Sequence, residues 1–197
     1  MPNLIVDQLK TTTPGAIFSA SSFFGLAPRN TIDQTLLRLT KSGQIRKIST
    51  GLFCIPKAHP ILGSLNPSLD DSVQAYGHKF GYQIQVHPLK AANLLGLSQQ
   101  VPAKSIYLTD GPNRSLVLGG QDVILKHVCP RKLLGIGTKA GLIVQALYSF
   151  GARGINQPLI NKLKVLIDKN DCQKLQNWLN LMPGWMQKVV TALIENV

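Results

Sequence analysis

The first 56 residues alternate hydrophobic and polar positions with the period of helices and then of a β-hairpin. Apolar residues recur every three to four positions in the helical stretches, and β-branched residues flank a Thr50-Gly51 turn signal in the last stretch. The predicted helices cover residues 4–9, 16–26 and 31–43, and the predicted hairpin covers residues 45–55. The N-terminal part is therefore expected to hold three helices and two strands.

A proline-rich stretch separates this part from the rest of the chain. Pro56, Pro60 and Pro67 stand with Gly63 and Ser64 in a segment without a hydrophobic period, and such clusters are typical of loops. We expect a linker over residues 58–67, which divides an N-terminal domain, residues 1–57, from a C-terminal domain, residues 68–197.

The C-terminal domain is predicted to mix helices with short strands. Three β-rich runs, at 104–109, 115–118 and 123–128, are separated by the turn-forming sequences Asp-Gly-Pro-Asn and Gly-Gly-Gln-Asp, which favours an antiparallel meander. The other predicted elements are helices at 69–80, 88–95, 138–150, 157–168 and 171–195, the last interrupted by Pro183-Gly184, and a strand at 82–86.

The charge of the chain indicates a polyanionic partner. The 197 residues are 44% hydrophobic and 15% charged, a composition that folds rather than stays disordered. Lysine and arginine total 21 against 9 acidic residues, which gives a net charge of +12. Because the excess is spread over the whole chain and forms no tail, it belongs to folded segments that face nucleic acid or an anionic membrane surface.

Cysteine spacing and hydropathy exclude several classes of protein. Cys54, Cys129 and Cys172 stand far apart without a CxxC pair, which excludes a disulfide scaffold and a zinc finger and suits a reducing cytosol. The longest apolar run, residues 141–150, is interrupted by Gln145 and is shorter than the roughly 20 residues of a membrane span. No signal peptide is expected. We therefore expect a cytoplasmic protein without a membrane partner.

The predicted helix at 31–43 has a polar face suited to DNA. Thr31 and Gln34 have the spacing of a capping box, and Ile32, Leu36 and Leu39 fall on one side, within about 40° of each other. The opposite side presents cations and amides within roughly 80°, namely Asn30, Gln34, Arg38 and Lys41.

These side chains match the chemistry of the major groove. Arginine bonds guanine, asparagine and glutamine bond adenine, and lysine contacts phosphates. The hairpin adds Arg46, Lys47, Ser49 and Thr50. Three helices followed by a hairpin predict a winged helix-turn-helix, so the expected fold class is α+β, with this unit followed by a mixed α/β domain with a small antiparallel sheet and a helical C-terminal tail. The same polar face could instead be solvated or contact a protein, which makes a protein-interaction module an alternative.

Several short motifs are shared with a known family. The N-terminal ones are Arg29-Asn30-Thr31-Ile32, the Leu-Leu-Arg-Leu run at 36–39, Ser42-Gly43-Gln44-Ile45, and Gly51-Leu52-Phe53 leading to Pro56. More specific are the runs AANLLGLSQQVP at 91–102 and IYLTDGP at 106–112. Residues 15–56 resemble the winged-helix head of bacterial AbiEi-type antitoxins, the antitoxin half of type IV (abortive-infection) toxin–antitoxin systems. The combined match, over residues 10–135, also looks like a related bacterial winged-helix family of poorly defined function.

The resemblance implies an autoregulator of transcription. Such a protein binds inverted repeats in its own promoter, which favours paired binding, and counters a nucleotidyltransferase-like toxin without needing a stable complex with it. The DNA-binding positions then map onto Arg29, Asn30, Thr31, Gln34, Arg38, Lys41, Arg46, Lys47, Ser49 and Thr50. The toxin-countering part is residues 68–197.

A metal-dependent nuclease is the alternative with catalysis. Asp110, Asp122, Lys126 and His127 lie on adjacent predicted strands. A PD-(D/E)xK site needs an acid two residues before the lysine, whereas Asp122 precedes Lys126 by four, and turn chemistry accounts for both aspartates. The four histidines lack paired spacing for zinc. We therefore expect no enzyme, no metal and no cofactor.

A second polar surface is a candidate in the C-terminal domain. Its members are Asn93, Ser98, Gln99, Gln100, Arg131 and Lys132. The first four follow a helix, so they either form a recognition surface or satisfy the backbone at the helix end near Gly96. The tail carries Trp178, Met182, Trp185 and Met186, which are expected to pack the tail helices together.

Overall fold

The structure of the protein is a computed structural model, which describes residues 2–59, 61, 63–100 and 102–195. The chain forms two compact units, of which unit 1 comprises Met1–Tyr82 and Leu116–Asp122, and unit 2 comprises Gln83–Ser115 and Val123–Val197. Both units combine helices with small sheets, so the protein is a mixed α+β protein. None of the described helices is both long and apolar enough to cross a membrane.

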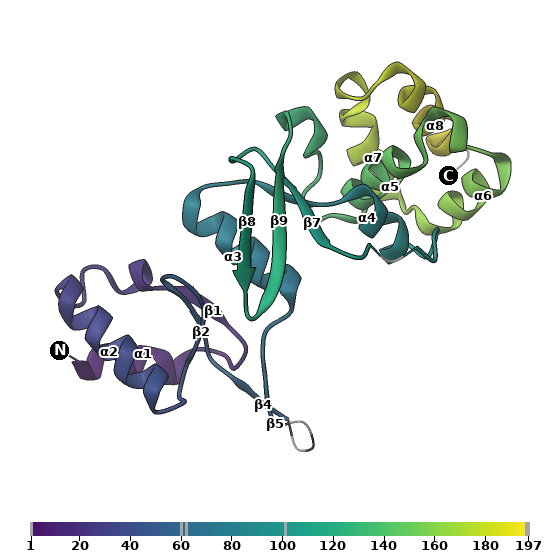
Figure 1. The fold of residues 1–197 in the computed structure, drawn as a ribbon. Coiled ribbons are helices and arrows are strands. Elements are labelled where there is room, and N and C mark those ends of the chain that lie inside the picture. Colours follow the sequence, from purple (N-terminus) through teal and green to yellow (C-terminus); the bar gives the residue numbers. More distant parts are fainter. Residues whose placement is uncertain (1, 60, 62, 101, 196–197) are drawn as a thin grey trace. The chain divides into compact units, whose positions relative to one another are not determined.

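The N-terminal part of unit 1 holds two helices, α1 and α2 (Figure 1), and a three-stranded antiparallel sheet in the order β1-β3-β2. Ile5 of α1 and Phe23, Ile32, Leu36 and Leu39 are buried together in one core. The elements in chain order are α1 (Pro2–Thr11), β1 (Ile17–Ser19), the 3₁₀ helix η1 (Ala20–Phe23), α2 (Arg29–Lys41), β2 (Arg46–Ser49) and β3 (Leu52–Cys54).

The expected helix at 16–26 is wrong. Ile17–Ser19 is extended and pairs with β3, with Ile17 opposite Cys54, and only one turn of 3₁₀ helix follows. Pairing of three residues with a neighbouring strand outweighs the weak helical preference of a segment that contains Ser19, Ser21 and Ser22. Gly25, with φ of 93°, prevents the helix from continuing.

The expected hairpin is confirmed, and the expected linker contains a pair of short strands. β2 and β3 are antiparallel and meet at the Thr50-Gly51 turn, where Gly51 has φ of 67°. In the expected linker and the residue before it, β4 (Lys57–His59) pairs with β5 (Gly63–Leu65) as a second antiparallel ladder. Pro60 lies outside the described residues.

Helix α3 (Leu69–Phe80) begins where the sequence predicted and belongs to unit 1. Ser68 caps it, its side chain accepting a hydrogen bond from the backbone N–H of Asp71, and Gly81 ends it in the left-handed conformation. The helix packs against β1. The contact-defined units therefore differ from the expected domains, because the chain does not change unit at residues 58–67.

A four-stranded sheet, most of whose residues belong to unit 2, has the order β6-β7-β9-β8. β6 pairs antiparallel with β7, whereas β7 and β9 are parallel, with Ser105 opposite Val123. The expected meander is therefore wrong in its order, since β9 lies between β7 and β8. The strands are β6 (Ile84–Val86), β7 (Ser105–Thr109), β8 (Arg114–Leu118) and β9 (Gln121–His127).

The helices of unit 2 form a second core, as predicted for the tail. Ile143, Leu163, Leu175 and Met186 are completely buried in it, and Trp178 and Trp185 pack against it, so the expected packing of the tail aromatics is confirmed. Figure 1 shows these helices gathered at the C-terminal end of the chain. They are α4 (Pro88–Leu94), the 3₁₀ helix η2 (Pro130–Lys132), α5 (Lys139–Gly154), α6 (Gln157–Leu166), α7 (Lys169–Asn177), the 3₁₀ helix η3 (Leu179–Leu181) and α8 (Gly184–Ile194).

Candidate nucleic-acid interface

Helix α2 is held in unit 1 by one apolar side. Ile32, Leu36 and Leu39 are buried, and Thr35 among them donates a hydrogen bond from Oγ1 to the carbonyl of Thr31 at 2.7 Å. The helix begins at Arg29, with Pro28 as its N-cap. The expected capping box is therefore wrong, because Thr31 already lies inside the first turn and Pro28 stops the helix from extending further back.

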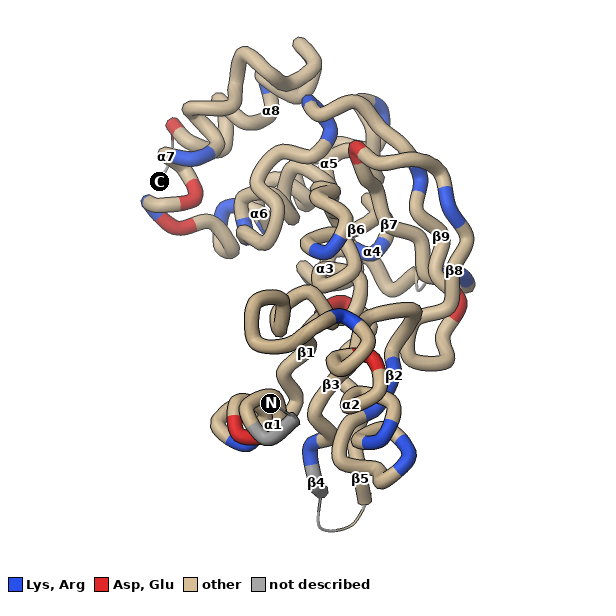
Figure 2. The backbone as a smooth tube through the Cα atoms, turned by 90° about the vertical axis from the view of Figure 1, so that its left-hand side faces the viewer, with Lys and Arg blue, Asp and Glu red and all other residues tan. Residues whose placement is uncertain are grey.

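The opposite side of α2 is exposed to solvent. Asn30, Gln34, Arg38 and Lys41 all lie on it, and their side chains form no hydrogen bond or ion pair with another described residue. Figure 2 marks the lysine and arginine positions along the backbone in blue. Arg38 and Lys41 stand in the last turn, where cations also interact favourably with the helix dipole. Four polar side chains on one face are thus free to contact a ligand.

Arg29 has a different environment from the other cations of α2. Its Nε donates a hydrogen bond to Oδ2 of Asp33 at 2.9 Å. Its guanidinium carbon lies 5.3 Å from the ring centre of Phe24. Both groups are largely exposed, so Arg29 chiefly neutralises the carboxylate that would otherwise make the first turns of α2 less attractive to an anion.

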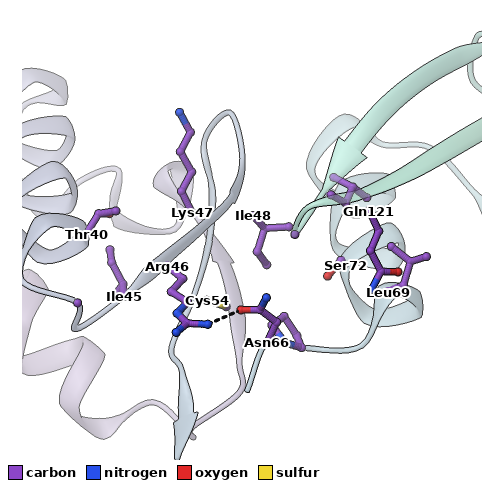
Figure 3. Close-up of a pocket in the computed structure, with 14 residues that line it drawn as sticks. Thr40, Ile45, Arg46, Lys47, Ile48, Cys54, Asn66, Leu69, Ser72 and Gln121 are labelled. Carbon is purple, nitrogen blue, oxygen red and sulfur yellow. Dashed lines mark hydrogen bonds between the residues drawn. The ribbon is translucent and has the colours of Figure 1, made fainter. Parts of the chain in front are cut away.

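The two cations of β2 lie on different sides of the strand, as strand alternation requires (Figure 3). Arg46 donates hydrogen bonds to Oδ1 of Asn66 at 2.9 Å and to the carbonyl of Ser64 at 3.3 Å, beside a cavity of about 480 Å³. Lys47 is exposed and forms no hydrogen bond or ion pair with the described part of the chain. Of the two, Lys47 is available to a phosphate.

The tip of the β2–β3 hairpin is braced within unit 1. Nζ of Lys79, near the end of α3, donates a hydrogen bond to the carbonyl of Thr50. On the other side of the hairpin, the backbone N–H of Gly119 donates to the carbonyl of Ile48 at 3.1 Å. Burial, together with the charge of Arg29, lowers the pKa of Lys79. Ser49 and Thr50, which the sequence assigns to DNA binding, therefore lie on a hairpin that is held in place. Ser49 is half-buried and Thr50 is exposed.

Sequence reasoning missed two residues of this interface. Lys79 lies 29 positions from its partner Thr50, so only the fold brings them together. Leu37 is 57% exposed on the outer side of α2. A helical wheel places Leu37 between Asn30 and Asp33, about 60° from Gln34. Its position on the outer side of the helix could therefore have been predicted from the sequence.

The second polar surface of unit 2 is used largely by its own loop. Nδ2 of Asn93 donates to the carbonyl of Ser98 at 3.2 Å, and Oγ of Ser98 accepts from the backbone N–H of Gln100 at 3.1 Å. These bonds favour the reading in which the cluster closes the end of α4. Gln99, Arg131 and Lys132 are exposed.

Two of the residues considered for a nuclease, Asp110 and His127, serve the fold of unit 2. Oδ1 of Asp110 accepts from the backbone N–H of Gln83 at 2.8 Å. His127 has its Nδ1 2.9 Å from the carbonyl of Gly111, and its backbone N–H donates to Asn113. Asp122 and Lys126 are exposed on β9. Among the described residues, no group of three or more histidine, cysteine, aspartate or glutamate side chains could hold a metal ion.

The fold and the site together define a two-unit α+β protein whose N-terminal unit exposes a cationic, amide-bearing helix face beside a braced hairpin. Residues 4–175 match the model of DUF6088, a family of unknown function, and the chain belongs to this family. No curated protein matches the chain.

Proposed function

We propose that this protein binds duplex DNA through a winged helix-turn-helix in unit 1 and regulates transcription of its own gene. The element order α1, β1, η1, α2, β2, β3 and the sheet order β1-β3-β2 support the proposal. In it, α2 is the recognition helix and the β2–β3 hairpin is the wing. The short η1 takes the place of the helix that precedes the recognition helix.

The exposed face of α2 carries the proposal. Gln34 and Arg38 extend from it without partners in the described chain, so their full hydrogen-bonding capacity is available to base edges. Glutamine can bond adenine N6 and N7 with two hydrogen bonds, and arginine can bond guanine O6 and N7. A buried Gln34 or Arg38 would have been incompatible with this role.

Phosphate contacts would then set the register and the affinity. Lys41 at the end of α2 and Lys47 on the wing are exposed lysines without partners in the described chain, and lysine serves as a point charge for phosphates. Arg46 is held by Asn66 and contributes mainly through its charge. The net charge of +12 adds non-specific attraction to DNA.

The antitoxin role is the second half of the proposal. The resemblance of residues 10–135 to AbiEi-type antitoxins supports a cytoplasmic protein that occupies inverted repeats in its own promoter. Residues 68–197 would counter a nucleotidyltransferase-like toxin without catalysis and without a stable complex. The test is growth rescue: the full chain should restore growth to cells that express such a toxin from the adjacent reading frame, and Arg38→Ala should rescue equally because it affects only DNA binding.

Fluorescence anisotropy with duplex DNA from upstream of the gene tests the DNA-binding half. Arg38→Ala should cost about 1–3 kcal/mol of specific binding and relax specificity at one base pair. Lys47→Ala should weaken every duplex similarly and reduce the slope of log K against log salt by about 1. Lys162→Ala, at an exposed lysine of α6 in unit 2, is the matched control.

Three outcomes would contradict the proposal. They are unchanged binding in both variants, binding that does not weaken between about 50 and 200 mM salt, and cleavage of the duplex in the presence of magnesium or manganese. The second would favour a protein-interaction module and the third a nuclease.

A further inference from the structure

One large apolar side chain of α2 faces solvent rather than the core. Leu36 and Leu39 are 1% and 4% exposed, whereas Leu37 between them is 57% exposed. The apolar side of the helix is complete without it, since Ile32, Leu36 and Leu39 fill the core together. The packing of unit 1 therefore does not account for a leucine at position 37.

Leu37 borders the polar face of α2 and lies between Asn30 and Asp33 on the helical wheel. With a turn of 100° per residue, it lies within about 60° of Asn30, Gln34 and Lys41. Residues three and four apart on a helix have Cβ atoms about 5–6 Å apart, so Gln34 and Lys41 flank Leu37 on the turns before and after it. A groove that receives Gln34 and Lys41 must also receive Leu37.

We propose that Leu37 is a specificity-determining residue that packs against the C5-methyl group of a thymine in the major groove. This inference rests on the proposed function, because it needs α2 to enter the groove. The thymine methyl is the apolar group on the major-groove edges of unmodified base pairs. Contact removes both the methyl group and the leucine from water, which stabilises the complex.

The surroundings of Leu37 favour DNA over a protein partner. Arg38 and Lys41 give this side of the helix a positive charge, and Arg29 neutralises Asp33, the acid of α2. A phosphate backbone complements such a surface, whereas an apolar protein surface would have to bury two unpartnered cations at cost. A single leucine between polar groups matches a single methyl group between base edges.

The experiment has two stages and uses the full chain. In the first, duplexes are selected from a pool of random sequence by rounds of binding at moderate salt. In the second, each thymine of the selected duplex is replaced singly by deoxyuridine, which removes the C5-methyl group and keeps the hydrogen-bonding groups. Binding of the natural chain and of Leu37→Ala is then measured to every duplex.

The natural chain should lose about fourfold in affinity at one thymine, the factor expected for one buried methylene-sized group. Leu37→Ala should bind the thymine and deoxyuridine duplexes equally, within twofold. Leu4→Ala is the matched control because Leu4 is 54% exposed on helix α1, and it should keep the fourfold discrimination. Since Leu37 is exposed and alanine favours helices, both variants should fold.

The outcomes distinguish this inference from the function on which it rests. If the natural chain selects no sequence and binds DNA no better than a neutral protein, the proposed function fails and the inference fails with it. A selected sequence whose affinity is insensitive to deoxyuridine overturns the role of Leu37 alone. A third outcome is that Leu37→Ala still distinguishes thymine from deoxyuridine but has a different molecular mass in light scattering. Leu37 would then belong to a contact between copies of the chain, and the inference would be overturned.

Discussion

Nε of Arg29 donates a hydrogen bond to Oδ2 of Asp33 over 2.9 Å, so an acid next to the proposed groove-facing side of α2 is neutralised one turn away. The pair is exposed, and such pairs add little to stability. Its main effect is on the electrostatic potential of the surface, because it cancels one negative and one positive charge at the start of the helix.

Asp33→Asn should therefore strengthen DNA binding rather than weaken the fold. The substitution frees the charge of Arg29 and removes a carboxylate that repels phosphates. We expect the affinity for a random duplex to rise several-fold at about 50 mM salt, and the salt slope to steepen by about one phosphate contact. Asp7→Asn on α1 is the control, since Asp7 forms a similar exposed pair with Lys10. An affinity that falls in Asp33→Asn would mean that Asp33 itself contacts the DNA.

Lys79→Met should loosen the wing without unfolding unit 1. Nζ of Lys79 holds the carbonyl of Thr50 at the tip of the hairpin, whereas the methionine keeps most of the apolar stem. We expect faster amide hydrogen exchange at Gly51 and Leu52, and a loss of about two- to fivefold in DNA affinity at low salt, because a mobile wing must be ordered on binding. Unchanged exchange at both amides, measured beside Lys162→Met, would show that the hairpin holds its position without α3.

His87 should make the stability of unit 2 depend on pH. Its Nδ1 accepts a hydrogen bond from the backbone N–H of Leu89 and caps α4. Burial, with a smaller effect of the Lys126 charge, lowers the pKa of His87 below its ordinary value of 6.5. The folded chain therefore takes up this proton less readily than the unfolded chain. The contribution of neutral His87 to the stability of the folded chain is complete above pH 6.5 and is lost as the pH falls through the lowered pKa.

His87→Asn should remove this dependence, because asparagine can cap the helix but does not titrate. Thermal denaturation between about pH 7.5 and 5 measures it, with a decline towards low pH expected in the natural chain and a smaller one in the variant. His78→Asn, at an exposed histidine of α3 in unit 1, is the control and should keep the decline. Identical curves for all three proteins would mean that His87 is not the titrating cap.

Gly141→Ala should strongly destabilise unit 2. A Cβ at Gly141 would lie 1.9 Å from the carbonyl oxygen of Gly135, so the loop before α5 would have to move. That loop is also held by Thr138, whose Oγ1 donates to the same carbonyl. We expect the free energy of unfolding to fall by about 3 kcal/mol or more, measured by urea denaturation.

Gly184→Ala provides the matched comparison, because no described atom comes within 4 Å of the added Cβ at the start of α8. It should change the free energy of unfolding by less than about 1 kcal/mol and in the stabilising direction. Equal losses in the two variants would show that helix propensity or the unfolded chain, and not the approach of Gly135, decides the effect.

The sequence located the helices better than the strands. α3 and α4 coincide with the predicted stretches, since their N-caps, Ser68 and His87, and the glycines that follow them are local signals. The sequence predicts a helix where β1 forms, because the pairing of β1 with β3 joins residues more than 30 positions apart. The predicted meander is wrong for the same reason, because short strands separated by similar turns do not specify which strands pair.

At the candidate interface, the sequence by itself determined which side chains α2 turns outward. The helical period fixes Gln34 and Arg38 opposite Ile32 and Leu36 wherever the helix lies. Only the tertiary structure decided which cations remain available. Arg29 bonds Asp33, Arg46 bonds Asn66, and Lys79 bonds the carbonyl at the tip of the wing. Only the bond between Arg29 and Asp33 joins neighbours on one helix. Periodicity reports what each residue faces on its own element, whereas hydrogen bonds across 20 or 29 positions form only after the chain has folded.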